Sequence, residues 1–286
     1  MLKTLQQAID WAADTLHDLE TPRVDAEWLL MHVLQCTRTR LLTHADQTLT
    51  KQQTVAFEQA IMRRHAGEPV AYITGTRGFW TLDLHVTPDV LIPRADTELL
   101  VEQALALADN QARLCVADLG TGSGAIALAI ASERPNWQVL AVDSSAAALM
   151  LARKNARLNH LSHVEFYEGN WCEALPDNLL LDMVVSNPPY IDAADPHLLA
   201  GDLRFEPMSA LRAAENGLSD LRTLSAQAYE RLKPGGWALF EHGYNQGPAV
   251  QTLLQQSGFV GIRTIRDHGD QDRVTMGKKA EGSDHE

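Results

Sequence analysis

The hydrophobic positions of the first 75 residues recur at the three- and four-residue spacing of amphipathic helices. Thr21 stands before Pro22, a pair typical of a helix N-cap and first helical position, and Thr50 is expected to cap a later helix. Residues 1–75 are therefore predicted to form a separate bundle of about four helices. The periodic positions are Leu2, Leu5, Ile9, Ala12, Leu16, Ala26, Leu29, Leu30, Val33, Leu34, Val55, Phe57, Ala60 and Ile61.

Residues 76–95 change to a period of two. The run 79–86 alternates apolar and polar side chains, Thr87-Pro88-Asp89 is a turn signal, and a second apolar run follows at 90–92 until Pro93 ends it. This pattern predicts a β-hairpin that links two domains.

From residue 96 onward, short apolar runs alternate with helical patterns, which predicts an α/β domain with a parallel sheet covered on both faces. Only residues 267–272 separate the last two strands, so one of them is expected to be antiparallel. The domain is predicted to span 96–286, with a flexible tail at 278–286. The seven predicted strands are 114–119, 138–142, 163–167, 181–185, 236–241, 261–266 and 273–276, and the predicted helices are 97–108, 124–133, 145–158, 217–232 and 245–257.

The composition and net charge of the chain limit the kinds of partner that we expect it to bind. The chain has 286 residues and a formal net charge of −13, which argues against nonspecific nucleic-acid binding because such proteins usually present a basic surface. The start of the chain has no apolar signal-peptide core, and no stretch is long and apolar enough to span a membrane. Its three cysteines (Cys36, Cys115 and Cys172) and eleven histidines show no metal-binding spacing. We expect a cytoplasmic protein without a metal.

A glycine-rich turn follows the first strand of the second domain, in the order Gly120-Thr121-Gly122-Ser123-Gly124. Glycines permit positive φ values and a close approach of ligand to backbone, and the following helix offers free N–H groups. Asp143 ends the next strand, where a carboxylate can accept ribose hydroxyls. With Ala125 the loop also satisfies a dinucleotide pattern, but Asp118 favours a ligand that carries an ammonium group, as S-adenosylmethionine does.

Asn187-Pro188-Pro189-Tyr190 follows the fourth predicted strand. Two prolines cannot extend a central strand, so the chain stops there and presents hydrogen-bond acceptors and an aromatic ring. Such a set suits a planar group that bears an NH2, either an amide or the exocyclic amine of a base. Because both loops follow carboxyl ends of strands near the switch point of the sheet, we expect them to face one crevice.

The predicted chemistry is methyl transfer by in-line displacement. An amide nitrogen is a poor nucleophile, so its lone pair must be aimed at the methyl group. Asn187 can accept one N–H through its side-chain oxygen, the Pro188 carbonyl can accept the other, and Tyr190 can pack on the plane of the group. Most of the rate gain would come from positioning and electrostatic preorganisation.

Over residues 1–277 the sequence resembles the peptide chain release factor N(5)-glutamine methyltransferases, the PrmC/HemK family. The resemblance rests on motifs along the whole chain, and the visible departure is Ala95, where the family often has a second proline. The motifs are Gly67-Glu68-Pro69, Gly78-Phe79-Trp80, Leu91 to Glu98, Asp118 to Gly124, Asp143, Asn170-Trp171, Ser186 to Ile191, Arg204 to Pro207 and Glu241-His242-Gly243.

The resemblance implies a helical N-terminal domain for substrate recognition, a hairpin linker and a seven-stranded, Rossmann-like class I methyltransferase domain. It implies that Gly120 to Gly124, Asp143, Trp171 and Asn187 contact S-adenosylmethionine, with Trp171 beside the adenine, and that S-adenosylhomocysteine is the product. It implies that Asn187 to Tyr190 bind the glutamine of the Gly-Gly-Gln loop in bacterial class I release factors. We expect no direct nucleic-acid partner, no membrane association and a monomer.

Some alternatives stay open. Asn-Pro-Pro-Tyr would suit an adenine-N6 methyltransferase of DNA or RNA equally well, and the fold could serve as a noncatalytic binding module. Arg94, Asp96 and Glu98 either line the crevice or merely begin a helix. His242 is expected to be structural.

Overall fold

The computed structural model describes residues 3–199 and 201–281 of the 286-residue chain. The chain divides into two compact units, Met1–Thr76 with Ala200–Phe205 and Arg77–Leu199 with Glu206–Glu286. Each is described by itself. Leu2 and the end of the predicted tail lie outside the described residues.

The first unit contains five helices in its described part, one more than the pattern predicted, and its core consists of their apolar stripes. Thr50 forms a complete capping box with Gln53. Thr21 lies at the N-cap before Pro22, but its hydroxyl donates to the Asp25 carboxylate and makes no cap bond. The helices are α1 (Leu5–Thr15), α2 (Pro22–Leu34), α3 (Arg38–Thr43), α4 (Lys51–His65) and α5 (Val70–Thr74).

A later segment, Gly201–Phe205, belongs to this helical unit. Arg64 is buried and joins it to α2, donating from Nε to Asp25 at 2.7 Å and from Nη1 to Asp202 at 2.8 Å. Arg204 donates to the Ala66 carbonyl at the end of α4 at 2.8 Å. Charged hydrogen bonds of this kind hold a segment in place more strongly than neutral ones.

The hairpin lies earlier in the chain than predicted. Its strands are β1 (Thr76–Phe79) and β2 (Leu82–His85), so the turn falls at Trp80-Thr81 and not at residues 87–89. The prediction was wrong because Trp80 adopts a φ of 56°, a conformation that bulky residues rarely take. The Glu98 carboxylate accepts the Trp80 N–H at 2.9 Å and stabilises this turn. Residues 90–92 form no strand.

A seven-stranded sheet forms the centre of the second unit, in the order β10-β11-β9-β6-β3-β4-β5. Strand β11 pairs antiparallel with both neighbours, as predicted for the last pair, and the other pairings are parallel. The strands are β3 (Cys115–Leu119), β4 (Gln138–Asp143), β5 (Glu165–Glu168), β6 (Leu181–Ser186), β9 (Leu232–Glu241), β10 (Phe259–Arg266) and β11 (Asp272–Lys279). Strand β11 thus continues past Gly277 into the segment predicted to be a flexible tail.

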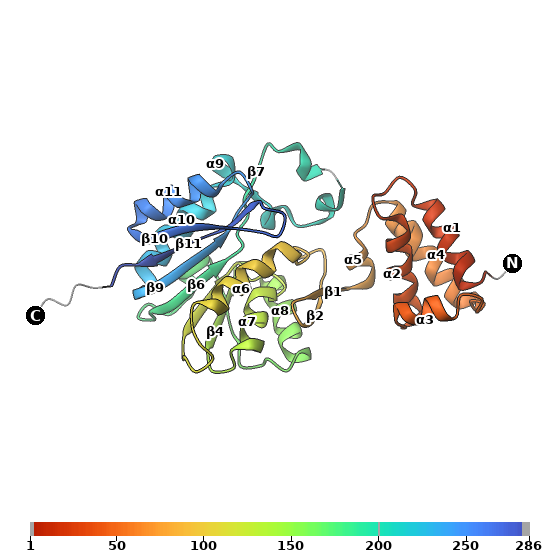
Figure 1. The fold of residues 1–286 in the computed structure, drawn as a ribbon, viewed down its shortest axis with the longest axis horizontal. Helices are drawn as coiled ribbons and strands as arrows, with labels where there is room; N and C mark the ends of the chain where they lie inside the picture. Colours follow the sequence, from red (N-terminus) through yellow and green to blue (C-terminus); the bar gives the residue numbers. More distant parts are fainter. Residues whose placement is uncertain (1–2, 200, 282–286) are drawn as a thin grey trace, which may run out of the picture. The chain divides into compact units, whose positions relative to one another are not determined.

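Helices cover both faces of this sheet (Figure 1). Helices α6 (Glu98–Ala106), α7 (Ala125–Glu133) and α8 (Ala146–Leu158) pack on one face, and α10 (Ser219–Arg231) and α11 (Gly247–Ser257) on the other. All five residues of β3 are buried, as expected for a central parallel strand. The smaller elements are α9 (Ala214–Gly217), β7 (Ile191–Asp192), β8 (Arg212–Ala213), and the 3₁₀ turns η1 (Ala95–Thr97), η2 (Trp171–Ala174), η3 (Pro196–Leu199), η4 (Gly201–Phe205) and η5 (Met208–Ala210).

The chain order along the sheet reverses between β3 and β6, which are neighbours. At such a switch point the loops after two adjacent parallel strands diverge and leave a crevice beyond their carboxyl ends. The glycine loop follows β3 and Asn187 follows β6, so the fold places both predicted loops at that edge.

Candidate functional site

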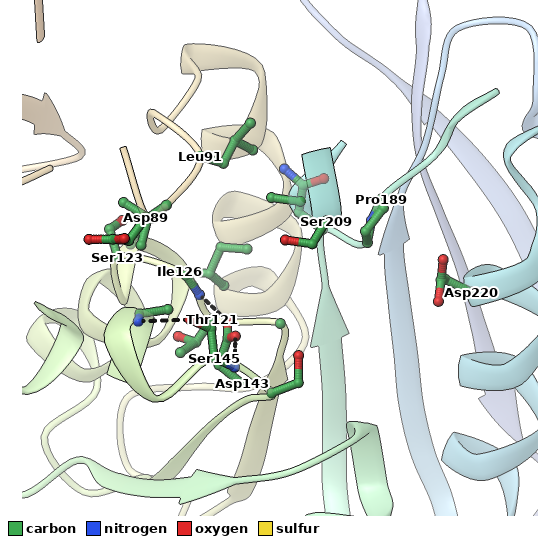
Figure 2. A pocket seen from close by; sticks show the side chains of 18 of the residues that line it. Asp89, Leu91, Thr121, Ser123, Ile126, Asp143, Ser145, Pro189, Ser209 and Asp220 are labelled. Carbon is green, nitrogen blue, oxygen red and sulfur yellow. Dashed lines mark hydrogen bonds between the residues drawn. The ribbon is translucent and has the colours of Figure 1, made fainter. Parts of the chain in front are cut away.

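A pocket with a cavity volume of about 340 Å³ lies in the second unit beyond the carboxyl ends of the strands. It is lined from the glycine loop, the end of β4, the turn after β5, the loop after β6, and the segments before α6 and before α10. Figure 2 shows Thr121, Asp143 and Ser145 grouped together, with Leu91, Pro189 and Ser209 elsewhere around the same pocket. The two predicted loops therefore share one cavity.

The glycine loop is tied to the neighbouring strand and covered by an indole. The backbone N–H groups of Gly120 and Thr121 both donate to the Val142 carbonyl at 2.9 Å. Gly120 has a φ of 78°, and a Cβ built on it would lie 3.1 Å from the Trp171 ring. A side chain at this position would therefore strain the backbone and push the ring away.

Two other members of the predicted loop differ in their surroundings. Gly122 has a φ of 56° with open space where a Cβ would point, and it lines the pocket. Gly124 is not among the lining residues; it precedes α7, and a Cβ there would crowd Leu128 and Ala152. Gly124 thus serves the packing of helices α7 and α8.

Asp143 joins the loop to the next helix. Its Oδ2 accepts the Gly122 N–H at 2.8 Å and its Oδ1 accepts the Ser145 N–H at 2.9 Å. Burial raises the pKa of the Asp143 carboxyl, and the backbone N–H groups counteract that effect. Each carboxylate oxygen keeps a second acceptor site, so this side chain can bind a diol while it fixes the loop.

Asp118 was expected to face the ammonium group of a ligand, and this prediction was wrong. Asp118 is fully buried, does not line the pocket, and uses Oδ2 to accept from the Thr121 hydroxyl at 2.6 Å and the Ala127 N–H at 3.1 Å. Burial raises the pKa of its carboxyl to about 7. Asp118 supports the loop from below, and its Oδ1 has no hydrogen-bond partner within residues 3–199 and 201–281.

A second support of the glycine loop, Asn155 on α8, was not predicted from the sequence. This residue is fully buried, and its Nδ2 donates to the Ser123 carbonyl at 2.9 Å and the His85 carbonyl at 3.0 Å. Its Oδ1 accepts the His85 N–H at 2.8 Å. One amide thus links the glycine loop to the end of β2, a long-range contact that no local pattern reveals.

The Asn-Pro-Pro-Tyr segment divides between pocket and core. Asn187 and Pro189 line the pocket, whereas Pro188 and Tyr190 do not. The Tyr190 hydroxyl donates to Glu241 Oε1 at 3.3 Å, and burial, with the Glu241 charge, raises the pKa of its phenol above the usual value. A direct contact between the Tyr190 ring and a substrate therefore stays a prediction.

Asn187 is oriented by a residue that the sequence did not single out for this role. Its Nδ2 donates to the Thr97 hydroxyl at 3.1 Å. Thr97 occupies the N-cap position of α6, but its side chain makes no cap bond there. The Asn187 Oδ1 and the Pro188 carbonyl accept no hydrogen bond from the described part of the chain. Asn187 lines the pocket, whereas Pro188 is buried and does not, so a contact between the Pro188 carbonyl and a ligand stays a prediction.

Arg94, Asp96 and Glu98, in the segment that leads into α6, differ in whether they line the pocket or serve the fold. Arg94 lines the pocket and forms an ion pair with buried Glu206, which also accepts the Ile92 N–H at 3.1 Å. Glu98 does not line the pocket and holds the hairpin turn, and Asp96 lies 3.4 Å from Arg273. Arg94 therefore fixes the wall of the pocket, and its two acidic neighbours serve the fold.

His242 is structural, as the sequence predicted. It is fully buried, with Nδ1 2.9 Å from the Gly243 carbonyl and Nε2 2.7 Å from the Thr275 hydroxyl. Burial lowers the pKa of its imidazole. Among residues 3–199 and 201–281, no group of three or more potential metal ligands converges, and no helix there is long and apolar enough to cross a membrane.

Two family models match the chain: the PrmC N-terminal domain over residues 7–75 and the methyltransferase small domain over residues 95–203. Among solved structures, a methyltransferase from Pyrococcus furiosus matches 78% of this chain and 98% of its own, with a TM-score of 0.54 and 16% identity. The 16S rRNA N2 G1207 methyltransferase of Thermus thermophilus matches 71% of this chain and 49% of its own, also with a TM-score of 0.54 and 20% identity. These likenesses confirm the predicted methyltransferase fold.

Curated relatives match over nearly the whole chain. The release factor glutamine methyltransferase of Xylella fastidiosa (strain Temecula1) is 56% identical over 90% of this chain and 93% of its own length. The proteins of the same name from Vibrio cholerae and Escherichia coli K12 are 48% and 45% identical, over 97% and 94% of this chain and 98% and 97% of their own lengths. With such identity over nine-tenths or more of its length, the chain belongs to the release factor glutamine methyltransferase family.

Proposed function

We propose that this protein transfers a methyl group from S-adenosylmethionine to the side-chain amide nitrogen (N5) of the glutamine in the Gly-Gly-Gln motif of bacterial class I release factors. The observation that carries the proposal is the single pocket in which Asp143 and the glycine loop meet Asn187 and Pro189. The names of the relatives support the substrate class.

The residues present fit the donor. Gly120 leaves room for the Trp171 ring beside the backbone, and Gly122 leaves open space above the loop. We assign Gly120 to Ser123 and Trp171 to the donor site, with Asp143 accepting the ribose hydroxyls; Gly124, predicted for the same site, supports the loop through helix packing. S-adenosylmethionine, when bound, supplies a methyl group on a positively charged sulfur, which departs with the electron pair of the broken S–C bond.

The chain's own residues then orient the acceptor. We assign the Asn187 Oδ1 and the Pro188 carbonyl to the two N–H groups of the glutamine amide, so that its lone pair points at the methyl group. Pro189 restricts this backbone, and Tyr190 packs beside it. The glutamine nitrogen forms the N–C bond and then releases one N–H proton to solvent water, because this proton is acidic once the nitrogen is alkylated. Positioning and electrostatic preorganisation provide the rate gain.

Residues 1–75 are proposed to recognise the release factor, because a small pocket alone cannot select one protein glutamine among many. Within the proposal, residues 76–95 act as a linker and 96–286 as the catalytic domain. The protein acts as a cytoplasmic monomer without a direct nucleic-acid partner, which light scattering of the purified protein and a DNA-binding titration would test.

The experiment compares three acceptors with labelled S-adenosylmethionine: a release factor, the same factor with its loop glutamine replaced by alanine, and duplex DNA. We expect label on the first alone. Label on DNA, or label that persists on the glutamine-less factor, would contradict the proposal. Asn187→Ala is the matched enzyme control: we expect its turnover to be lost while donor affinity, measured by calorimetry, stays close to that of the parent protein.

A further inference from the structure

A polar cluster adjoins Asn187, and one of its members, Thr97, lines the pocket together with Asn187. Thr97 is 4% exposed and Glu241 is 1% exposed. Asn187 donates to the Thr97 hydroxyl at 3.1 Å, and Tyr190 donates to Glu241 Oε1 at 3.3 Å. The cluster thus connects both ends of the Asn-Pro-Pro-Tyr segment to the end of β9 and to the turn before α6.

Glu241 is the acceptor at the base of the cluster. Its Oε1 accepts from Tyr190, and its Oε2 has no hydrogen-bond partner within the described residues. Burial raises the pKa of the Glu241 carboxyl to about 7, and the hydroxyls of Thr97 and Tyr190 counteract part of that effect.

The hydrogen bond between Asn187 and Thr97 orients the amide. A threonine hydroxyl oxygen can accept a hydrogen bond, and the Thr97 oxygen accepts from the NH2 end of the Asn187 amide at 3.1 Å. The oxygen end of that amide must then point the other way, toward the open position in the pocket.

We propose that Thr97 is a positioning residue that fixes which end of the Asn187 amide faces the glutamine substrate. The inference deepens the proposed function and rests on it. Without the hydroxyl, the Asn187 amide is free to turn over, and its NH2 would then face the NH2 of the glutamine. Two donors facing each other cannot form a hydrogen bond, and the glutamine lone pair loses its aim at the methyl group.

The test uses the full-length enzyme with a release factor as substrate. Thr97→Val keeps the shape of the side chain and removes the hydroxyl, whereas Thr97→Ser keeps the hydroxyl. Thr275→Val is the matched control: this threonine is also fully buried, and its hydroxyl bonds to His242 and Thr264 rather than to the cluster. For each variant, kcat, the donor affinity and the melting temperature are measured.

We expect kcat of Thr97→Val to fall on the order of 10- to 100-fold, because small errors in orientation have effects of that size. Donor affinity should stay within about twofold, and Thr97→Ser should recover most of the lost kcat. Thr275→Val should lower the melting temperature and leave kcat close to that of the parent. If Thr97→Val does not fold, Thr97→Ala provides a second variant without the hydroxyl.

Equal kcat values for Thr97→Val and Thr97→Ser, with an active parent enzyme, would overturn the inference and leave the proposed function intact. A loss of kcat in Thr275→Val as large as that in Thr97→Val would also overturn the inference, because a general loss of domain stability would then explain both losses of kcat. A parent enzyme that never labels the glutamine would instead remove the proposed function, and the inference with it.

Discussion

The support of the glycine loop by Asn155 gives a prediction whose magnitude follows from the structure. Replacing Asn155 by alanine removes three hydrogen bonds of 2.8, 3.0 and 2.9 Å at a fully buried side chain. The N–H and carbonyl groups of His85 and the carbonyl group of Ser123 then lose this partner. A buried polar group without a partner costs about 1–3 kcal/mol, so the variant should lose roughly 3 kcal/mol of unfolding free energy.

That loss is a large fraction of the roughly 5–15 kcal/mol that stabilises a typical protein. Urea unfolding followed by the fluorescence of the six tryptophans would measure it. The matched control is Asn159→Ala at the C-cap of the same helix. Asn159 is only half-buried, and its side chain donates to the Asp83 carbonyl at 3.1 Å and to the Asn155 carbonyl at 3.0 Å. Its loss should cost about 1 kcal/mol.

The same variant should also weaken donor binding, because Ser123 is part of the pocket lining. A loop that must be reordered on binding loses affinity, by about tenfold for each 1.4 kcal/mol. Calorimetry with S-adenosylmethionine would measure this, and Asn159→Ala should bind like the parent. The reasoning would be refuted if Asn155→Ala cost no more stability than Asn159→Ala, or if its donor affinity were unchanged.

Three further outcomes are expected. Gly120→Ala should weaken donor binding, because the new Cβ meets the Trp171 ring at 3.1 Å with φ at 78°. Gly78→Ala is the control and should bind the donor like the parent, because a Cβ there meets open space. Equal affinities of the two variants in calorimetry would contradict this expectation. Asp143→Ala should mainly reduce donor affinity, and an unchanged value would refute the ribose assignment. Burial raises the pKa of Glu241 from 4.5 to about 7, so the folded state keeps a proton that the unfolded state has lost between these pH values. That contribution to stability is present below about pH 4.5 and is lost as the pH rises to 7, at roughly 1.4 kcal/mol per pH unit. Glu241→Gln should therefore show a shallower fall of unfolding free energy over this range in urea titrations at several pH values, and a parallel curve would exclude the raised pKa.

The architecture was predictable because strand and helix patterns alternate clearly. Apolar runs such as 181–185 and the short gap at 267–272 were sufficient for a parallel sheet with an antiparallel final pair. The hairpin was misplaced because its turn depends on the positive φ of Trp80 and on a distant carboxylate, Glu98. Neither leaves a local signal, since tryptophan is no typical turn residue.

The candidate site was predictable to the same extent. Asp143 ends β4 and Asn187 follows β6, and these strands flank β3 on either side, so topology alone brings both residues to one pocket. Asp118, in contrast, was expected to face the ligand but lies beneath the loop. Thr97 and Asn155 act through contacts across 90 and 32 residues of chain, and one sequence holds no record of such pairs.

The group that Asn187 holds is proposed to be a glutamine side chain. The most direct measurement is tandem mass spectrometry of the Gly-Gly-Gln peptide, taken from a release factor after incubation with this enzyme and S-adenosylmethionine. We predict one added methyl group on the glutamine side chain. This methyl group should be absent when the Asn187→Ala variant is used in place of the parent enzyme. A methyl group on any other residue of the factor, or an unmodified peptide beside methylated adenine in added DNA, would contradict the account.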